Sequence, residues 1–132
     1  LQADRFDEAI EQLTAATQAG GNNANAFYNL GAAYINKAVS INDQIQQKED
    51  ALRQERASLT QAQRDQRQAE IDALVRQRTQ LFQQAVTPLQ RARELRQTAG
   101  EDVREVCRAL FQSMANSGQA QQAQEYRACA GL

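Results

Sequence analysis

The stretch between Gly31 and Gly100 contains no other glycine and only one proline, Pro88. These two residue types are the strongest interruptions of regular structure. Apolar residues recur through the stretch at spacings of three, four and seven, which places them on one face of a helix. Ala, Gln, Arg, Glu and Leu are abundant, whereas β-branched and aromatic residues are too sparse for a sheet protein. The sequence therefore predicts an all-α protein with two unusually long helices.

Capping signals divide the chain into about five helices. Gly20 or Gly21 suits the left-handed residue that follows a helix, and Asn22 or Asn23 can cap the next one. The expected helices span 4–18, 24–57, 60–97, 101–115 and 119–130.

The second and third helices are expected to pair as an antiparallel, coiled-coil-like hairpin. The segment "RASLTQAQRDQ" is the plausible turn between them. Two pairs in it have capping-box spacing, Ser58 with Gln61 and Thr60 with Gln63. A reversal near Ser58 brings Tyr34 level with Phe82, so that the two apolar stripes face each other.

Two residues inside these helices, Pro88 and Gly31, are unfavourable in a helix interior. Pro88 lies in phase with the apolar stripe, which favours a kink at this point over a new helix capped by Thr87. Gly31 costs about 1 kcal/mol relative to alanine in a helix. Because it lacks a Cβ, we expect the partner helix to approach closely there, near Ala85.

Charge and reactive residues argue against several classes of function. The net charge is −1 with interspersed signs, so no nucleic-acid partner is expected. The chain has no histidine, no glycine-rich phosphate loop and no nucleophile elbow, so we expect no enzyme, no cofactor and no metal site. Two cysteines alone cannot form a structural zinc site. No apolar run is long enough to span a membrane.

The pattern Phe27-x2-Leu30-Gly31-x2-Tyr34 resembles the W-x2-L-G-x2-Y signature of the tetratricopeptide repeat. "RFDEAIEQLTAA" looks like the second helix of such a repeat, and "LFQQAVTPLQRA" repeats that arrangement with Phe82, Ala85, Leu89 and Ala92. A weaker copy follows at 110–130. The resemblance implies tetratricopeptide-like helical hairpins and a concave groove that binds a protein or peptide.

The chain departs from an ordinary repeat by a long insertion. Roughly forty extra residues, about 38–80, separate the two halves of the middle repeat. The simplest solution is a single domain, 1–132, in which 4–37 and 81–131 supply the repeat helices and the insertion projects as a helical hairpin. The usual repeat-end proline is replaced by glycine at Gly21 and by Gln97 elsewhere.

In such folds the first helix of each repeat lines the groove. The residues that the resemblance places there are Asn25, Tyr28, Asn29, Ala32, Ile35 and Asn36, with Arg104, Glu105, Arg108 and Gln112 from the fourth helix. Asparagine amides can bond an extended peptide backbone, and Arg108 could take a carboxylate. Tyr28 and Ile35 would be exposed apolar groups in the groove, unless a further N-terminal helix buries them. The alternative is that the polar members are ordinary solvated side chains.

The long hairpin supports a second hypothesis. Its charges alternate in sign, which is typical of a solvated or self-pairing face, so the chain could instead be a structural module that forms a homodimer through the hairpin or through an exposed end helix.

Cys107 and Cys129 lie nearly level in the last helical pair. A disulfide is possible if the chain is exported, but packed helix axes 8–10 Å apart favour two buried thiols. The "NLGAAYxNKA" helix is similar to one in envelope-associated bacterial repeat proteins, which favours a bacterial, exported protein over a cytoplasmic one.

Overall fold

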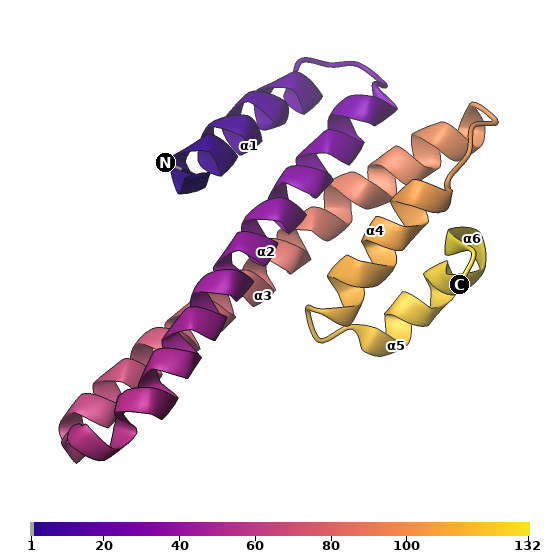
Figure 1. Cartoon of the computed structure of the whole chain (residues 1–132). Helices are drawn as coiled ribbons and strands as arrows, with labels where there is room; N and C mark the ends of the chain where they lie inside the picture. The colour runs from indigo at the N-terminus through magenta and orange to yellow at the C-terminus, as the bar shows by residue number, and fades with distance from the viewer. Residues whose placement is uncertain (1) are drawn as a thin grey trace.

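Two helices of 32 and 38 residues dominate the molecule, α2 (Ala24–Glu55) and α3 (Gln61–Thr98). The computed structural model describes residues 2–132, and within that range it contains no strand. Helix α1 (Gln2–Gln18) lies along the first part of α2, and α4 (Arg104–Ala115) packs between the last part of α3 and the C-terminal pieces of the chain (Figure 1). The all-α prediction and the long antiparallel hairpin are confirmed.

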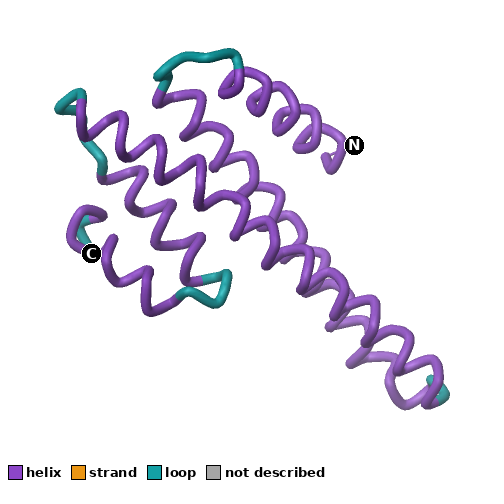
Figure 2. The backbone as a smooth tube through the Cα atoms, turned by 180° about the vertical axis from the view of Figure 1, so that it is seen from behind, coloured by secondary structure: helices purple, strands orange, loops and turns teal. Residues whose placement is uncertain are grey.

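The far half of the hairpin stands clear of the other helices. Figure 2 shows α2 and α3 continuing together, without a third helix beside them, to the turn that joins them. We call this projecting part, residues 43–77, the arm, and the remainder the base.

Capping residues explain where the two long helices begin. The Asn23 side chain accepts hydrogen bonds from the backbone N–H groups of Asn25 and Ala26, at 3.0 and 3.3 Å. Thr60 and Gln63 form a complete capping box at the start of α3. Of the two capping boxes that the sequence allowed, the structure thus uses the second.

The turn of the hairpin lies two residues later than predicted. A 3-10 turn, η1 (Arg56–Ser58), continues α2, and the extended residues are Leu59 and Thr60. Moving the pivot by two residues moves the pairing of the helices by four, which is about one helical turn. Accordingly Gly31 lies against Leu89, and the prediction that it meets α3 near Ala85 is wrong by that turn.

Gly31 is nevertheless a point of close approach, as predicted. A Cβ at this position would lie 2.6 Å from Leu89 Cδ2 and closer still to Leu89 Cγ. Leu89 is fully buried, so its side chain has no open space to move into. The absence of a side chain at Gly31 is what lets the two helices meet here.

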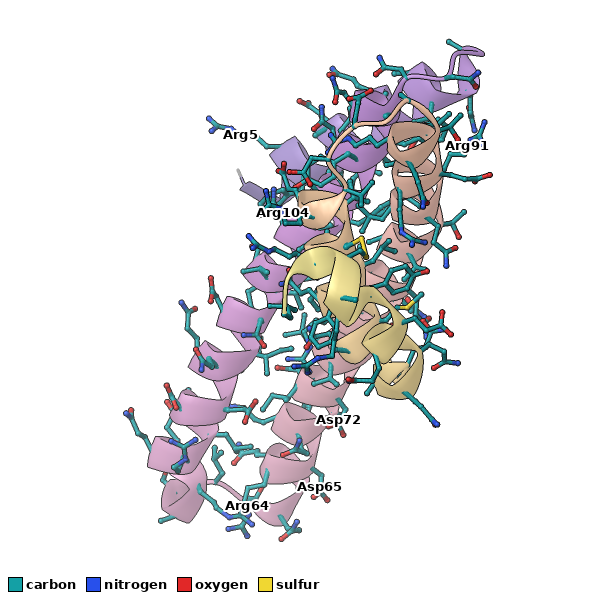
Figure 3. The ribbon with its side chains drawn as sticks, turned by 90° about the vertical axis from the view of Figure 1, so that its right-hand side faces the viewer. Arg5, Arg64, Asp65, Asp72, Arg91 and Arg104 are labelled. Atoms are coloured by element: carbon teal, nitrogen blue, oxygen red, sulfur yellow. A yellow bond between two sulfur atoms is a disulfide. The ribbon has the colours of Figure 1, made fainter. Side chains whose placement is uncertain are left out.

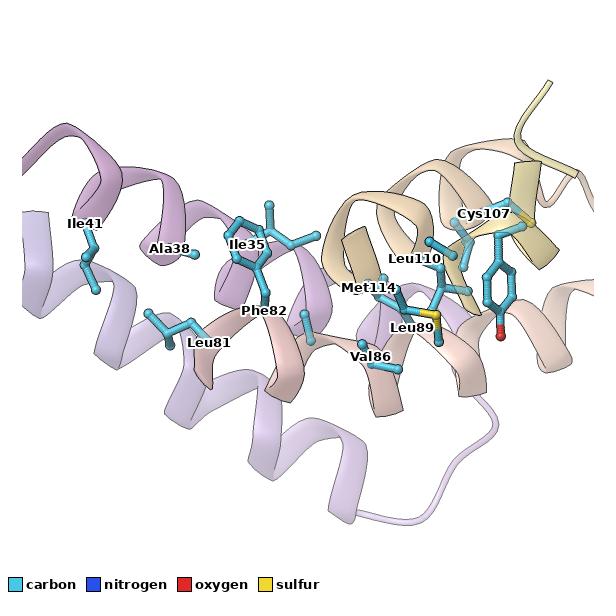
Figure 4. Packing of buried hydrophobic residues seen from close by; sticks show 14 of the residues in the cluster. Ile35, Ala38, Ile41, Leu81, Phe82, Val86, Leu89, Cys107, Leu110 and Met114 are labelled. Atoms are coloured by element: carbon cyan, nitrogen blue, oxygen red, sulfur yellow. The ribbon is translucent and has the colours of Figure 1, made fainter. Parts of the chain in front are cut away.

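The core continues from the root of the arm into the base. Figure 4 shows Phe82 beside Ile35, and Leu89, Leu110 and Met114 in the part of the same core that lies in the base. Pro88 is buried inside α3, which continues as one helix through that point, so no new helix begins at Thr87.

The fourth helix begins three residues later than predicted. Gly100, with φ +73°, ends α3 as expected. Asp102 then stays outside α4, because its carboxylate accepts a hydrogen bond from the Arg104 backbone N–H at 2.9 Å. Glu101 also precedes the helix, so the prediction that α4 starts there is wrong.

The expected last helix is broken into three pieces. They are α5 (Ala120–Ala123), the 3-10 turn η2 (Gln124–Tyr126) and α6 (Arg127–Ala130). A 3-10 turn rotates the chain by about 120° per residue instead of about 100°, so three residues add about 60°. This rotation brings Cys129 toward the face that carries Ala123 and Tyr126.

Cys107 and Cys129 form a disulfide, with their Cα atoms 5.8 Å apart. The preference for two buried thiols is therefore wrong. That preference assumed two regular helices at an ordinary axis distance, whereas the broken segment carries small, fully buried residues, Ala123 and Ala130, that let it approach α4 closely. We call residues 119–132, which this bond ties to α4, the C-terminal segment.

Candidate functional site

Helices α2 and α4 run parallel to each other, both resting on α3 (Figure 1). Tyr28 contacts Glu105 near the start of both helices, and Val39 faces Gln112 and Asn116 eleven residues further on. Residues that face each other across the two helices thus differ by 77 in residue number, and we call this difference the offset. We call the line between them the seam. Its residues are Tyr28, Ala32, Ile35 and Val39 from α2, and Glu105, Ala109, Gln112 and Asn116 from α4.

A polar cluster closes the first end of the seam. The Tyr28 hydroxyl donates to Glu105 Oε1 at 2.7 Å, and the Arg96 guanidinium lies 5.1 Å from the centre of the Tyr28 ring. Arg96 also donates to Asn25 Oδ1 at 3.1 Å. Tyr28 therefore joins α2, α3 and α4 through one side chain.

The environment of Tyr28 keeps its hydroxyl protonated. Burial, followed by the hydrogen bond to Glu105, raises the pKa of Tyr28 from 10.0 to about 12. Ionisation would place a phenolate beside the Glu105 carboxylate, and the nearby Arg96 offsets only part of that cost. Tyr28 accordingly acts as a hydrogen-bond donor over the ordinary pH range.

The middle of the seam is filled by apolar side chains. Ile35 is only 8% exposed and belongs to the core, so the expectation that it is an exposed groove residue is wrong. Its burial comes from packing within this chain, beside Phe82 (Figure 4). Ala32 and Ala109 are half-buried on the two sides of the seam.

The second end of the seam opens into a cavity of about 240 Å³. We call it the arm-base cavity, because it lies where α2 and α3 leave the base. It is lined by Val39 and Asn42 from α2, Arg78 and Phe82 from α3, and Gln112 and Asn116 from α4. Arg78 Nη1 donates to Asn42 Oδ1 at 2.6 Å, which fixes the direction of the guanidinium.

The other predicted groove residues fall into two groups. Asn29 and Asn36 are exposed on the solvent side of α2, with no side-chain hydrogen bond among the described residues. Arg104 pairs with Asp102, and Arg108 Nε donates to the Ala130 carbonyl at 3.0 Å. The bonds of Arg104 and Arg108 are therefore made within the C-terminal third of the chain, and none of them reaches α2.

Sequence reasoning missed the residues that shape the open end. Val39 continues the 28, 32, 35 spacing by one further step, so helical periodicity could have found it. Arg78 and Asn116 could not have been found in this way, because their position depends on the pairing of α3 with α2 and on the end of α4. Arg96 was missed for the same reason.

The arm presents charges of both signs. Residues 43–77 contain six basic and seven acidic side chains. Figure 3 shows Arg64, Asp65 and Asp72 among the charged groups around it. Ion pairs join its two helices, Lys48 with Glu70 and Arg67 with Glu55.

One flank of the arm also has a hollow of about 350 Å³. Leu52, Ile71 and Val75 contribute apolar surface to it, and charged residues such as Arg53 and Asp72 complete its lining.

In the described part of the chain, no cluster of three or more His, Cys, Asp or Glu residues could hold a metal ion. No helix there is both long and apolar enough to cross a membrane. Comparison of the chain with protein-family models, with curated proteins and with solved structures gives no match.

Proposed function

We propose that this chain is a non-catalytic module of the tetratricopeptide type that binds a protein or an extended peptide along the exposed face of α2 and α4. The observation that carries the proposal is the parallel arrangement of these two helices. In a tetratricopeptide array, the first helices of successive repeats lie side by side and line the concave face.

The 77-residue offset supports this assignment quantitatively. Successive tetratricopeptide repeats are about 34 residues apart. The offset of the seam exceeds this by about 43 residues, which is the length of the segment 38–80. The offset is thus what a repeat interrupted by that insertion would have.

The contact between Gly31 and Leu89 supports the same reading. Gly31 is the glycine of the Phe27–Tyr34 signature, and Leu89 is a large apolar residue of "LFQQAVTPLQRA". Their contact joins the first and second helices of the interrupted repeat at its base.

The exposed amides of α2 suit the proposed ligand. Asn29 and Asn36 lie two helical turns apart on the solvent side, so both amides are available to the backbone of an extended peptide. Arg108 is not part of this proposal, since its guanidinium already holds the C-terminal segment.

The disulfide adds a proposal about compartment. Disulfides persist in oxidising environments and are rare in the cytosol of most organisms. The Cys107–Cys129 bond therefore supports an exported protein.

Selection of peptides from a displayed random library against the oxidised chain tests the proposed function. We expect the selected peptides to lose at least about tenfold in affinity for the double variant Asn29→Ala, Asn36→Ala, because each lost amide removes hydrogen bonds of about 1 kcal/mol. The matched control is Gln46→Ala, Gln54→Ala, which removes two exposed amides from the arm. Equal losses in both variants, or no selected peptide, would contradict the proposal.

A second function, self-association through the arm, is favoured by the hollow lined by Leu52, Ile71 and Val75 and by the balanced charges around it. Sedimentation over a range of concentrations tests it. We expect a dimer that Arg53→Glu weakens and that Gln54→Glu, a neighbouring exposed position, does not. A chain that remains monomeric at every concentration would rule this function out.

A further inference from the structure

We propose that the arm-base cavity binds an acidic side chain of the partner peptide, together with an apolar side chain next to it. This inference deepens the proposed function, on which it rests, by naming the chemistry of one segment of the ligand. The partner segment we infer contains a leucine-like residue followed by glutamate or aspartate.

The charge of the cavity is the first part of the argument. Among its six lining residues, Arg78 carries the only charge, and no ion pair of the described side chains involves Arg78. The surrounding polar groups are the uncharged amides of Asn42, Gln112 and Asn116. A carboxylate that entered the cavity would therefore meet one unpaired cation and no like charge among the lining side chains.

The geometry of Arg78 is the second part. Its Nη1 is held by Asn42 at 2.6 Å, so the side chain is already directed before a ligand arrives. Arginine can make several hydrogen bonds in a fixed plane, and bonds to a carboxylate are stronger than bonds between neutral groups. A guanidinium fixed by one neutral partner keeps other N–H donors for an anion.

The apolar wall is the third part. Val39 is 44% exposed, one of only two large apolar side chains in the described chain that are this open to solvent. Phe82 lies on the same cavity and is nearly buried. An apolar group that covers Val39 would remove hydrocarbon surface from water, within reach of the carboxylate bound at Arg78.

The position of the cavity is the fourth part. The other end of the seam is closed by the bond between Tyr28 and Glu105, and its middle is filled by Ile35. A peptide lying along the seam therefore finds a hollow for side chains at the Val39 end. Asn36, one of the two asparagines proposed to bond the peptide backbone, lies one turn before Val39 on the same helix.

Three short peptides, acetylated and amidated at their ends, test the inference by NMR titration of the isotope-labelled, oxidised chain. The first contains Leu-Glu within an alanine background, the second Leu-Gln and the third Ala-Glu. We expect the Leu-Glu peptide to shift the amide signals of Asn42, Gln112 and Asn116. The affinity should fall about tenfold for Leu-Gln, which lacks the carboxylate, and several-fold for Ala-Glu, which covers less of Val39.

Variants of the chain identify the cavity as the site. Arg78→Gln should remove the preference for Leu-Glu over Leu-Gln, whereas Arg76→Gln, an exposed arginine outside the cavity, should retain it. Should Arg78→Gln fail to fold, Val39→Asp provides a second test at an exposed position. Val39→Asp should weaken binding of the Leu-Glu peptide more than Val39→Asn does, because it places a carboxylate against that of the ligand.

The inference would be overturned by equal binding of Leu-Glu and Leu-Gln, by an unchanged preference in Arg78→Gln, or by signal shifts confined to other surfaces. Acetate producing the same shifts with the same affinity would mean that the cavity binds small anions only, and this would also overturn it. Library peptides that depend on Asn29 and Asn36 but ignore Arg78 would contradict the inference while leaving the proposed function intact.

Discussion

At the scale of single residues, the side chains that matter most are those that control how closely helices meet. Gly31 permits contact between α2 and α3, and Tyr28 joins three helices at the closed end of the seam. The close approach at Gly31 could be predicted from sequence, because this glycine interrupts an otherwise strong helical run. The partners of Tyr28 could not, because they lie about 70 residues away and depend on the pairing of the helices.

We expect Gly31→Ala to lower the free energy of unfolding by about 1–3 kcal/mol, although alanine is the better helix former. The new Cβ would overlap Leu89, which is fully buried. Leu89→Ala should cost about 2–5 kcal/mol by itself through the cavity it leaves. The double variant should then be more stable than the sum of the two losses predicts, because the small side chain at position 89 makes room for the added methyl group.

Denaturant unfolding of the unsubstituted chain, the two single variants and the double variant measures this coupling between positions 31 and 89. Gly21→Ala is the matched control, since a Cβ there meets nothing within 4 Å and its φ is not positive. Additive losses in the double variant would mean that Gly31 and Leu89 are not in contact.

We expect Tyr28→Phe to cost about 1 kcal/mol at neutral pH, through loss of the hydrogen bond to Glu105. The folded-state pKa of Tyr28, about 12, lies above its ordinary value of 10.0. The contribution of the hydroxyl to stability is therefore constant below about pH 10 and declines as the pH rises from 10 toward 12. Unfolding of both proteins at several pH values measures the difference, and a difference that grew with alkaline pH would contradict this assignment.

At the scale of elements, the sequence predicts the regular helices well and the irregular joints poorly. The starts of α2 and α3 follow from side chains that cap their own backbone, such as Asn23 and Thr60. The pivot of the hairpin was missed by two residues, because η1 extends α2 with a turn that apolar spacing does not record. The break at η2 was missed because its cause lies in contacts of Tyr126 and Cys129 with other helices.

We expect the C-terminal segment to depend on the disulfide for much of its stability. Its helical pieces are three or four residues long, too short to be stable alone. We expect reduction to lower the free energy of unfolding by about 3 kcal/mol, the effect of opening a loop of this length between cysteines 22 residues apart. Hydrogen exchange should increase first in residues 119–132.

The variant Cys107→Ala, Cys129→Ala provides the matched control, since reducing agent should not change its stability further. Uniform acceleration of exchange over α2 and α4 as well would show that the bond supports the whole base and not one segment.

At the scale of the whole molecule, the base and the arm are built on different principles. The base packs helices from distant parts of the chain, whereas the arm buries a narrow stripe between two neighbours and surrounds it with charge. The sequence indicates this division through the thinning of apolar residues beyond Ile45. It does not indicate the arm-base cavity, because three separate helices contribute to it.

We expect the base to fold without the arm. Replacing residues 43–77 with a short polar turn removes the projecting part but keeps Asn42, Arg78 and the contact between Gly31 and Leu89. The shortened chain should unfold cooperatively and keep the disulfide, as measured by thermal unfolding and by thiol titration. A gradual transition would mean that the arm is required for the core of the base.

The continuity of α3 has a mechanical consequence. This helix runs without interruption for 38 residues, about 57 Å, from the tip of the arm to the far end of the base. Arg78, on one wall of the arm-base cavity, stands where the projecting part becomes the anchored part, and Asn42 stands opposite on α2. This pair therefore marks the place where the long α2–α3 hairpin leaves the support of α4. A bend of the arm about this pair would change the distance between the α2 and α3 walls of the cavity, because both walls continue into the arm as unbroken helices.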